Sequence, residues 1–210
     1  MLYTLIILIA LLDLLFVHLV SQSKRPRGFV GVLMMKLWNR TYLPMVRWAS
    51  GYIKGKKVNN ILDVGVGNGG STAYLTELFP NANITGIDLS ETAIAEAYKQ
   101  PIKGKVSFAV KDITQTDYLS ASFDLICAFQ THFHWQNAET AYTEIHRLLT
   151  DSGVLLIACE KSKIRYYLRD LEETGAFSSY MEHFGLYLEE TAQQNGWVLF
   201  VLLKKPVANS

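Results

Sequence analysis

One stretch of the sequence decides the fold: residues 61–70, which read ILDVGVGNGG. A short apolar run, residues 61–64, passes directly into a turn rich in glycine, and residues 71–79 read as a helix. A second apolar run, 83–87, then ends in Asp88. A strand, a glycine turn, a helix and a second strand with an acid at its end form the first half of a nucleotide-binding unit.

Each part of this unit has a physical role in binding a nucleotide. Glycine lacks a Cβ atom, so the backbone can turn tightly and approach a ligand closely. The helix N-terminus offers free N–H groups and a partial positive charge. Asp88 stands where a carboxylate can accept hydrogen bonds from both hydroxyls of a ribose.

The glycine spacing alone does not select the cofactor, because the G-x-G-x-x-G pattern that begins at Gly65 also fits NAD-binding proteins. Three further features favour a different cofactor. Asp63 stands two residues before the first glycine, and Gly69 extends the pattern to D-x-G-x-G-x-G. A third acid, Asp112, follows a third strand-like run over residues 106–110.

With these residues the chain resembles the class I S-adenosylmethionine (SAM)-dependent methyltransferases, over roughly residues 28–205. The resemblance implies an α/β fold with a Rossmann-like, doubly wound, mostly parallel sheet, here preceded by an N-terminal hydrophobic helix. It also implies SAM as the cofactor. In this family the acid and the glycines of the first motif cradle the methionine part of SAM, which gives that role to Asp63, Gly65, Gly67 and Gly69.

The resemblance assigns further positions of the cofactor site. The acid after the second strand, Asp88, is expected to bind the ribose, and the acid after the third, Asp112, to hold the adenine amino group. The predicted site also includes neighbours of these acids and the end of the fourth strand: Leu89, Ile113, Phe129 and Gln130. Two alternatives stay open, since the glycines can serve packing alone and Asp112 can be an ordinary loop acid.

The rest of the chain continues the alternation of strands and helices. Ser90 is placed to cap a helix that runs to Tyr98. After a polar loop, strands are expected at 123–129, 154–159 and 197–204, with a helix at 138–149, a turn at 151–153 and another helix at 163–174. Such alternation implies parallel strands joined by right-handed crossovers. Residues 197–204 match the antiparallel seventh strand of the family, whereas the sixth strand is poorly marked, because 180–189 also reads as helical. A long helical segment, 28–51, is expected to be interrupted near Pro44.

The loop after the fourth strand, residues 130–137, reads QTHFHWQN. Its two histidines and one tryptophan make it the loop with the most functional side chains. Ligands of such sheets bind outside the carboxyl ends of the strands, which places this loop beside the transferred methyl group. Because SAM itself supplies the leaving group, the protein mainly positions the two reactants. Gln130 and Thr131 are expected to shape the cofactor site, and Trp135 to form a lid or part of the core.

His132 and His134 are the candidate catalytic residues, because histidine titrates near neutral pH and either can act as a general base toward a hydroxyl or amine. The alternative is that one histidine caps a turn and the other faces solvent. Their spacing offers no third ligand, so no metal site is predicted. Glu160, at the end of the fifth strand, is a candidate substrate contact, and Tyr42 and Trp38 either cover the site or only pack. Cys127 and Cys159 are expected to be buried and reduced.

The N-terminus carries a nearly unbroken apolar run over residues 2–20. A spanning helix needs about 20 such residues, and the one acid, Asp13, costs about 2.5–3.5 kcal/mol at mid-span, which the leucines and isoleucines offset. No acid occurs between Asp13 and Asp63, whereas nine of the 20 basic residues do, so the positive-inside rule places the following domain in the cytoplasm. Basic residues there also attract anionic lipid.

We therefore expect residues 1–27 to be a membrane anchor with a basic flank and residues 28–210 to be the methyltransferase domain. Two alternatives remain for the apolar run. One is a helix that lies on the domain surface or in the groove of a partner. The other is a cleaved signal peptide, which is disfavoured because a basic start and an A-x-A-like site are both missing.

The resemblance is closest to the bacterial small-molecule branch that includes ubiquinone- and menaquinone-biosynthesis methyltransferases, through Gly28-Phe29, Met35, Asn39-Arg40 and the loop 129–135. It implies a small-molecule acceptor, and an anchor would favour a lipid or quinone-like one. No nucleic acid partner is expected, because a base-reading or stacking pattern and the N-P-P-Y motif are missing. The alternatives are a non-catalytic SAM-binding module tethered to the membrane, and an NAD(P)-dependent oxidoreductase, which leaves Asp63 unexplained.

Overall fold

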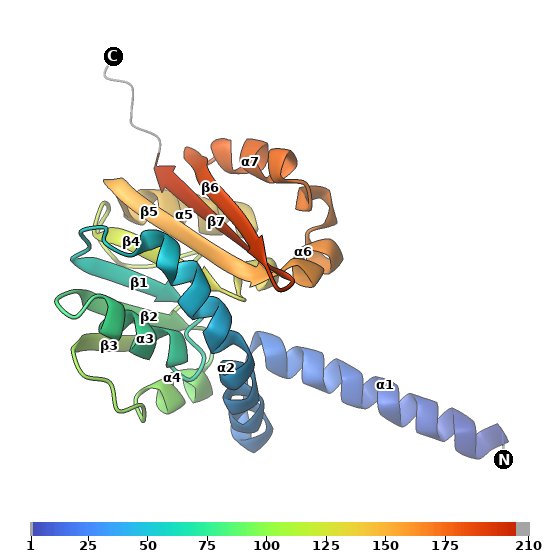
Figure 1. The fold of residues 1–210 in the computed structure, drawn as a ribbon. Coiled ribbons are helices and arrows are strands. Elements are labelled where there is room, and N and C mark those ends of the chain that lie inside the picture. Colours follow the sequence, from blue (N-terminus) through green and yellow to red (C-terminus); the bar gives the residue numbers. More distant parts are fainter. Residues whose placement is uncertain (1, 205–210) are drawn as a thin grey trace.

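The fold, known from a computed structural model that describes residues 2–204, is built on one seven-stranded sheet (Figure 1). Its strand order is β3-β2-β1-β4-β5-β7-β6; the strands β1 to β5 run parallel to one another, and β7 is antiparallel to both of its neighbours. The strands are β1 (Asn60–Val64), β2 (Asn83–Asp88), β3 (Lys105–Val110), β4 (Phe123–Phe129), β5 (Leu149–Glu160), β6 (Leu186–Gln194) and β7 (Trp197–Lys204). The predicted fold class is confirmed.

Helices cover both faces of the sheet. They are α1 (Leu2–Lys24), α2 (Gly28–Ser50), α3 (Gly70–Leu78), α4 (Glu91–Ala97), α5 (Ala138–Leu148), α6 (Lys161–Tyr167) and α7 (Thr174–Glu182), with short 3-10 turns at Gly51–Ile53, His132–His134 and Arg169–Leu171. Met45 of α2 and Leu75 of α3 pack on one face, whereas Tyr142 of α5 and Phe177 of α7 pack on the other. The central strand β4 alternates between the two cores, as expected of a strand buried on both sides.

Three expectations for the helices and turns need correction. The long helix α2 runs through Pro44 without a break. Pro44 and Arg40 are both exposed, so water can bond the Arg40 carbonyl that proline leaves without a partner. The helix expected at 163–174 is broken into α6, a 3-10 turn and α7, because Leu168 leaves the helical conformation (φ −132°, ψ 46°). The turn expected at 151–153 lies inside β5, beside a register shift against β4.

The poorly marked sixth strand is resolved as two elements. α7 ends at Glu182, and β6 begins at Leu186 after Gly185, whose φ of +71° suits glycine. Because β6 is an edge strand with mostly exposed or half-buried side chains, its sequence lacks the apolar alternation that marks an interior strand. The antiparallel seventh strand, β7, matches the prediction for 197–204. Cys127 and Cys159 are buried free thiols, as predicted.

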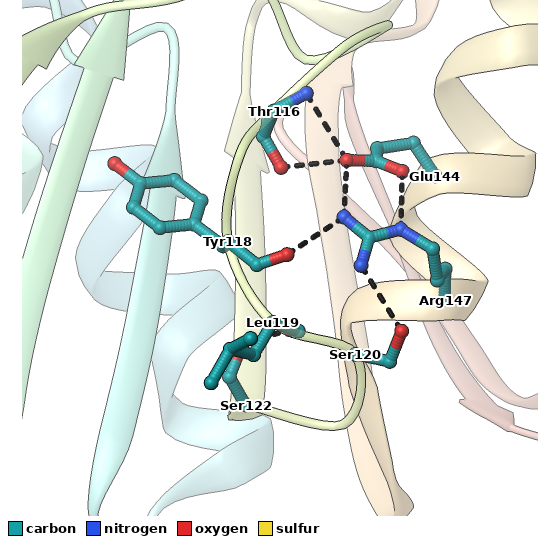
Figure 2. Close-up of polar contacts among 7 residues, drawn as sticks. All are labelled: Thr116, Tyr118, Leu119, Ser120, Ser122, Glu144 and Arg147. Atoms are coloured by element: carbon teal, nitrogen blue, oxygen red, sulfur yellow. Dashed lines mark hydrogen bonds and ion pairs between the residues drawn. The ribbon is translucent and has the colours of Figure 1, made fainter.

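The loop between β3 and β4 is fixed by one pair of charged residues on α5 (Figure 2). The Glu144 Oε1 atom accepts hydrogen bonds from the backbone N and the hydroxyl of Thr116, at 3.1 and 2.6 Å. Arg147 pairs with Glu144 at 2.7 Å and donates to the Tyr118 carbonyl at 2.9 Å and the Ser120 hydroxyl at 3.0 Å. The polar loop that the sequence predicts therefore has a defined path from the end of β3.

Helix α1 projects away from the domain, from the side at which the parallel strands end (Figure 1). Its side chains are exposed from Tyr3 to His18; Leu8, for example, is 54% exposed and Phe16 is 65% exposed. α1 is long and apolar enough to cross a membrane by length and composition. The alternative in which this helix packs on the surface of its own domain does not occur in the structure.

The position of α7 gives a test of the C-terminal topology. Phe177 is fully buried and stacks on Phe200 of β7 with ring centroids 4.1 Å apart. We expect Phe177→Ala to lower the free energy of unfolding by about 3–5 kcal/mol, because it leaves a cavity between α7 and the sheet. Leu119→Ala, at an 81% exposed position, is the control and should change it by less than about 0.5 kcal/mol. Equal effects of the two changes in denaturant titrations would show that α7 does not pack there.

Candidate cofactor site

A cavity of about 580 Å³ opens at the carboxyl ends of β1, β2 and β4. This volume lies in the range of cofactor and small-molecule sites. Its walls come from the glycine turn after β1, the ends of β2 and β4, the loop after β3, the inner face of α2 and the connection between α1 and α2. Parallel strands that all end at one edge bring these segments together, although they are far apart in the sequence.

The glycine turn forms the floor of this cavity. Gly65 has a φ of +75°, and a Cβ atom there would lie 2.5 Å from the Thr131 hydroxyl, so only glycine lets the loops after β1 and β4 meet. Gly70, the first residue of α3, is packed in the same way under the side-chain amide of Asn39 from α2. Gly67 faces open space and lines the cavity. The turn is therefore shaped both by its neighbours and for close approach of a ligand.

Asp63 lies behind the glycine turn and is only 1% exposed. Its Oδ2 atom accepts hydrogen bonds from the hydroxyls of Ser71 and Thr72, both at 2.7 Å. Burial raises the pKa of this carboxyl to about 6, against the opposing effect of the two hydroxyls. Asp63 and Gly69 do not line the cavity, so the structure gives them a positioning role at the start of α3.

Asp88 ends β2 and borders the cavity. Its Oδ2 atom accepts a hydrogen bond from the Gly67 backbone N at 3.0 Å, and its Oδ1 atom accepts one from the Ser90 N at 2.9 Å. Burial raises the pKa of Asp88, while these two hydrogen bonds and the charge of Arg25 act in the opposite direction. The carboxylate is thus held in one orientation and keeps lone pairs for a ligand in the cavity.

The remaining residues of the predicted cofactor site mostly line the cavity as well. Asp112 is exposed at the rim and accepts a hydrogen bond from the Thr114 N at 2.9 Å, an ordinary bond within a turn. Apolar side chains beside it and across the cavity offer surfaces for a planar ring. These are Leu89, Ile113 and Phe129, of which Leu89 is 42% exposed and the other two are buried.

Gln130 has an unusual backbone and an unpaired amide. Its φ of +56° lies in the left-handed region, which non-glycine residues rarely adopt. Its Oε1 atom accepts a hydrogen bond from the Glu160 N at 3.1 Å, while among residues 2–204 its buried Nε2 atom has no partner at hydrogen-bond distance, although Gln130 acts on the Tyr42 hydroxyl and lowers its pKa. A strained backbone and a polar side chain on a cavity wall are both features of ligand sites. The expected role of Gln130 in the cofactor site stays a prediction that this geometry favours.

The two histidines of the loop differ sharply in position. His132 is 1% exposed and lies outside the cavity wall, and neither of its ring nitrogens has a hydrogen-bond partner among the described residues. Burial lowers its pKa to about 3. His134 lines the cavity, and burial together with the charges of Lys24 and Lys163 lowers its pKa to about 4. Only His134 is therefore placed to meet a substrate, and it is neutral at pH 7.

Aromatic side chains form part of the cavity wall, which is called the aromatic wall below. Tyr42 of α2 donates a hydrogen bond to Glu160 at 3.2 Å, and burial together with the charge of Glu160 raises the Tyr42 pKa to about 12. Trp38 and Trp135 also line the cavity, whereas Glu160 does not. Tyr42, Trp38 and Trp135, the side chains expected to cover the site, thus line the cavity. Glu160, the candidate substrate contact, does not line it and only accepts the Tyr42 hydrogen bond.

Sequence reasoning missed part of the site. Lys163 of α6 and residues 23–26, between α1 and α2, line the cavity. The Pro26 carbonyl accepts a hydrogen bond from the Ser90 hydroxyl, and the Gln22 side chain accepts one from the Arg27 N at 2.7 Å, so this connection is fixed over the site. The expected division between residues 27 and 28 therefore runs through the wall of the cavity. No local pattern marks these residues, because their role depends on where α1 and α6 end.

Neither a metal centre nor the catalytic pair of an oxidoreductase is found at the cavity in the described residues. Among residues 2–204, no group of three or more His, Cys, Asp and Glu side chains is arranged to hold a metal ion. The sequence does contain one Tyr-x-x-x-Lys pair, the kind common in NAD(P)-dependent oxidoreductases, at Tyr52 and Lys56. Neither residue lines the cavity; Tyr52 packs on Trp48, and Lys56 lies 3.5 Å from Glu189.

Comparison with known proteins agrees with this geometry. Residues 62–157 match a family described as the methyltransferase domain. This match supports the predicted resemblance to the class I SAM-dependent methyltransferases, while the ubiquinone-like branch stays a prediction. The matched residues include the glycine turn, Asp88 and the loop after β4, and so cover most of the cavity floor.

Individual relatives are more distant. The chain is 33% identical over 138 residues to juvenile hormone acid O-methyltransferase from Bombyx mori, an alignment that covers 62% of this chain and 49% of that protein. It spans between 21% and 49% of the length of the first curated relatives that it matches.

Solved structures show the same fold. An O-methyltransferase family protein from Burkholderia thailandensis has a TM-score of 0.69 at 16% identity, over 82% of this chain and 59% of that one. A phosphoethanolamine N-methyltransferase from Haemonchus contortus, in complex with phosphomonomethylethanolamine and S-adenosylhomocysteine, has a TM-score of 0.61 at 18% identity, over 76% and 52%. These neighbours show the fold, and the predicted SAM cofactor agrees with the methyltransferase family match.

The buried carboxyl of Asp63 gives a pH-dependent test. Since its pKa is raised from 3.8 to about 6, folding favours the protonated form, and the stability that this form contributes is lost as pH rises through 6. We expect the free energy of unfolding of the wild type, relative to Asp63→Asn, to fall by about 2 kcal/mol between pH 4 and pH 7. A difference between the two proteins that stays constant across this range would contradict the assigned burial of an ionisable group.

Proposed function

We propose that this protein is a SAM-dependent methyltransferase that acts on a small-molecule acceptor. The observation that carries the proposal is the position of Asp88 and the glycine turn on one cavity at the carboxyl edge of the sheet. Asp88 would hold the ribose hydroxyls, and Gly65 and Gly67 would border the methionine part. Asp112, Leu89 and Ile113 would border the adenine, and Phe129 and Gln130 would also contact the cofactor.

The chemistry requires little of the protein beyond placement. Bound SAM supplies a methyl group activated by its sulfonium centre. The chain contributes a pocket closed by α2, Trp135 and residues 23–26, which orients the acceptor and keeps water away. His134 is the one predicted catalytic residue that borders this space. Because its pKa is lowered to about 4, His134 is a weak base, which favours acceptors that need no strong base.

We further propose that the acceptor is lipid-like or quinone-like and that the protein is bound to the cytoplasmic face of a membrane. α1 supplies an exposed apolar helix of spanning length, and its basic flank suits the cytoplasmic side. The outer face of α2 adds exposed apolar side chains spaced by four residues, Phe29, Leu33 and Leu37, beside the exposed Lys36 and Arg40. Apolar and basic side chains on one helix face suit the surface of an anionic bilayer.

The mouth of the cavity lies next to the end of α1. Residues 23–26 border both the cavity and the last turn of that helix. An anchor at α1 would therefore hold the cavity close to the membrane surface, where an apolar acceptor is concentrated. The name of the relative from Bombyx mori, a methyltransferase of juvenile hormone acid, is consistent with an amphiphilic acceptor.

The cofactor assignment is tested by calorimetric titration of SAM into the full-length protein in a neutral detergent. We expect Asp88→Asn to weaken binding by about 10- to 100-fold, because a charge-assisted hydrogen bond to the ribose is lost. Asp170→Asn, at an exposed carboxylate outside the cavity, is the matched control and should leave the affinity unchanged. Absence of SAM binding by the folded wild type would overturn the proposed function. Transfer of a tritiated methyl group from SAM into a membrane lipid extract would then identify the acceptor class.

The membrane assignment is tested by extraction of isolated membranes with alkaline carbonate. We expect the wild type to stay in the membrane fraction and the double variant Leu8→Asp with Leu12→Asp to be released, because each added charge costs about 2.5–3.5 kcal/mol in the bilayer centre. The control introduces the same two charges at exposed apolar positions of the domain, Leu119→Asp with Tyr166→Asp, and should stay bound. Release of the wild type would contradict the anchor.

A further inference from the structure

Both acidic and basic side chains line the cavity. The two acids, Asp88 and Asp112, belong to the half formed by β2 and the loop after β3. Four cationic side chains line the cavity: Lys24, Arg25, Lys111 and Lys163. Lys111 is neutralised by Asp117 at 2.6 Å. Within residues 2–204, the other three have no carboxylate within ion-pair distance, which sets them apart as cations without a counter-charge.

Two of these cations meet at the loop after β4. The Lys24 Nζ atom, at the end of α1, lies 5.9 Å from the centre of the Tyr167 ring on α6. Lys163 stands four residues before Tyr167, on the same side of that helix. The His134 ring packs against the Tyr167 ring with centroids 5.1 Å apart, and both lysines act on the His134 charge. Lys24 and Lys163 therefore converge on one part of the cavity, beside His134.

Arg25 lies between the two halves of the cavity. Its charge acts on Asp88, at the cofactor side, while its neighbour Lys24 belongs to the opposite side. Like charges that gather without a counter-ion destabilise each other, and a bound anion removes that repulsion. The nearby walls are apolar and aromatic, formed by Trp38, Phe133 and Trp135, and they suit a hydrocarbon part.

We infer that Lys24 and Lys163 form a binding site for an anionic group, a carboxylate or a phosphate, on the methyl acceptor. This inference rests on the proposed function and narrows the acceptor to an anionic amphiphile whose apolar part lies against the aromatic wall. Lys24 comes from the membrane-proximal end of α1 and Lys163 from the domain, so the site is complete only when the end of α1 is held over the cavity. The anionic group thus enters between the anchor and the domain.

The experiment uses the full-length protein in nanodiscs of neutral phosphatidylcholine, saturated with S-adenosylhomocysteine. Octanoate, octyl phosphate, octanol and octylamine are titrated, and the fluorescence of Trp38 and Trp135, which line the cavity, reports binding. We expect at least one of the two anions to bind at least 10-fold more tightly than octanol and octylamine, with an affinity that falls in 0.5 M salt. The anion that binds more tightly identifies the head group as carboxylate or phosphate.

Variants separate this site from unspecific attraction. Lys24→Gln and Lys163→Gln should each weaken anion binding by about fivefold or more, with octanol binding unchanged. Lys161→Gln is the matched control on the same helix, because Lys161 lies 3.4 Å from Gln193 and outside the cavity wall. It should change neither. Equal affinities for octanoate, octyl phosphate and octanol, or unchanged anion binding in both test variants, would overturn the inference.

The same samples separate this inference from the proposed function. Binding of S-adenosylhomocysteine is measured first in each variant, and it also shows that the variant is folded. A wild type that does not bind S-adenosylhomocysteine contradicts the proposed function itself. Normal binding of S-adenosylhomocysteine without any preference for the anions contradicts the anionic acceptor alone.

Discussion

The buried carboxyl of Asp63 connects the end of β1 to the start of α3 through two hydrogen bonds, to Ser71 and Thr72. This connection fixes the glycine turn. The turn then holds the Gly67 N–H where it donates a hydrogen bond to Asp88. Burial of the carboxyl is unfavourable for its ionised form, as its raised pKa shows. The chain thus keeps a costly group at the position on which the geometry of the cavity floor depends, and an apolar residue could not make these bonds.

A second constraint is the packing of α2, which holds its part of the cavity wall in place. α2 packs its inner face on the start of α3, where Asn39 covers Gly70, and contributes Tyr42 to the aromatic wall. The connection that precedes α2 is bonded to the start of α4 through Ser90 and Pro26. Segments that lie next to α1 therefore form part of the cavity wall. In this way α1 can affect the proposed methyl transfer, although the helix itself projects away from the domain (Figure 1).

The parts of the site that could be predicted from sequence are local ones. The glycine turn, Asp88 and the strand that ends at Phe129 are each marked within a few residues by glycine, by an acid or by an apolar run. What could not be predicted depends on distant contacts. Leu168 breaks a segment that reads as one helix, β6 lacks alternation because it is an edge strand, and His132 is buried by Phe133 and Trp135 rather than open to substrate. Lys163 and residues 23–26 reach the cavity only through the three-dimensional arrangement of α1 and α6.

The central claim is that the carboxyl edge of the sheet holds the methyl donor, and hydrogen–deuterium exchange with and without S-adenosylhomocysteine tests it most directly. The full-length protein, saturated with this ligand, is predicted to exchange more slowly in peptides that contain residues 65–71, 87–90 and 129–136, with further protection at 23–27. Exchange in β6 and in the loop at 116–122, which lie away from the cavity, should not change. Protection confined to other parts of the chain, or no protection at saturating ligand, would contradict the account.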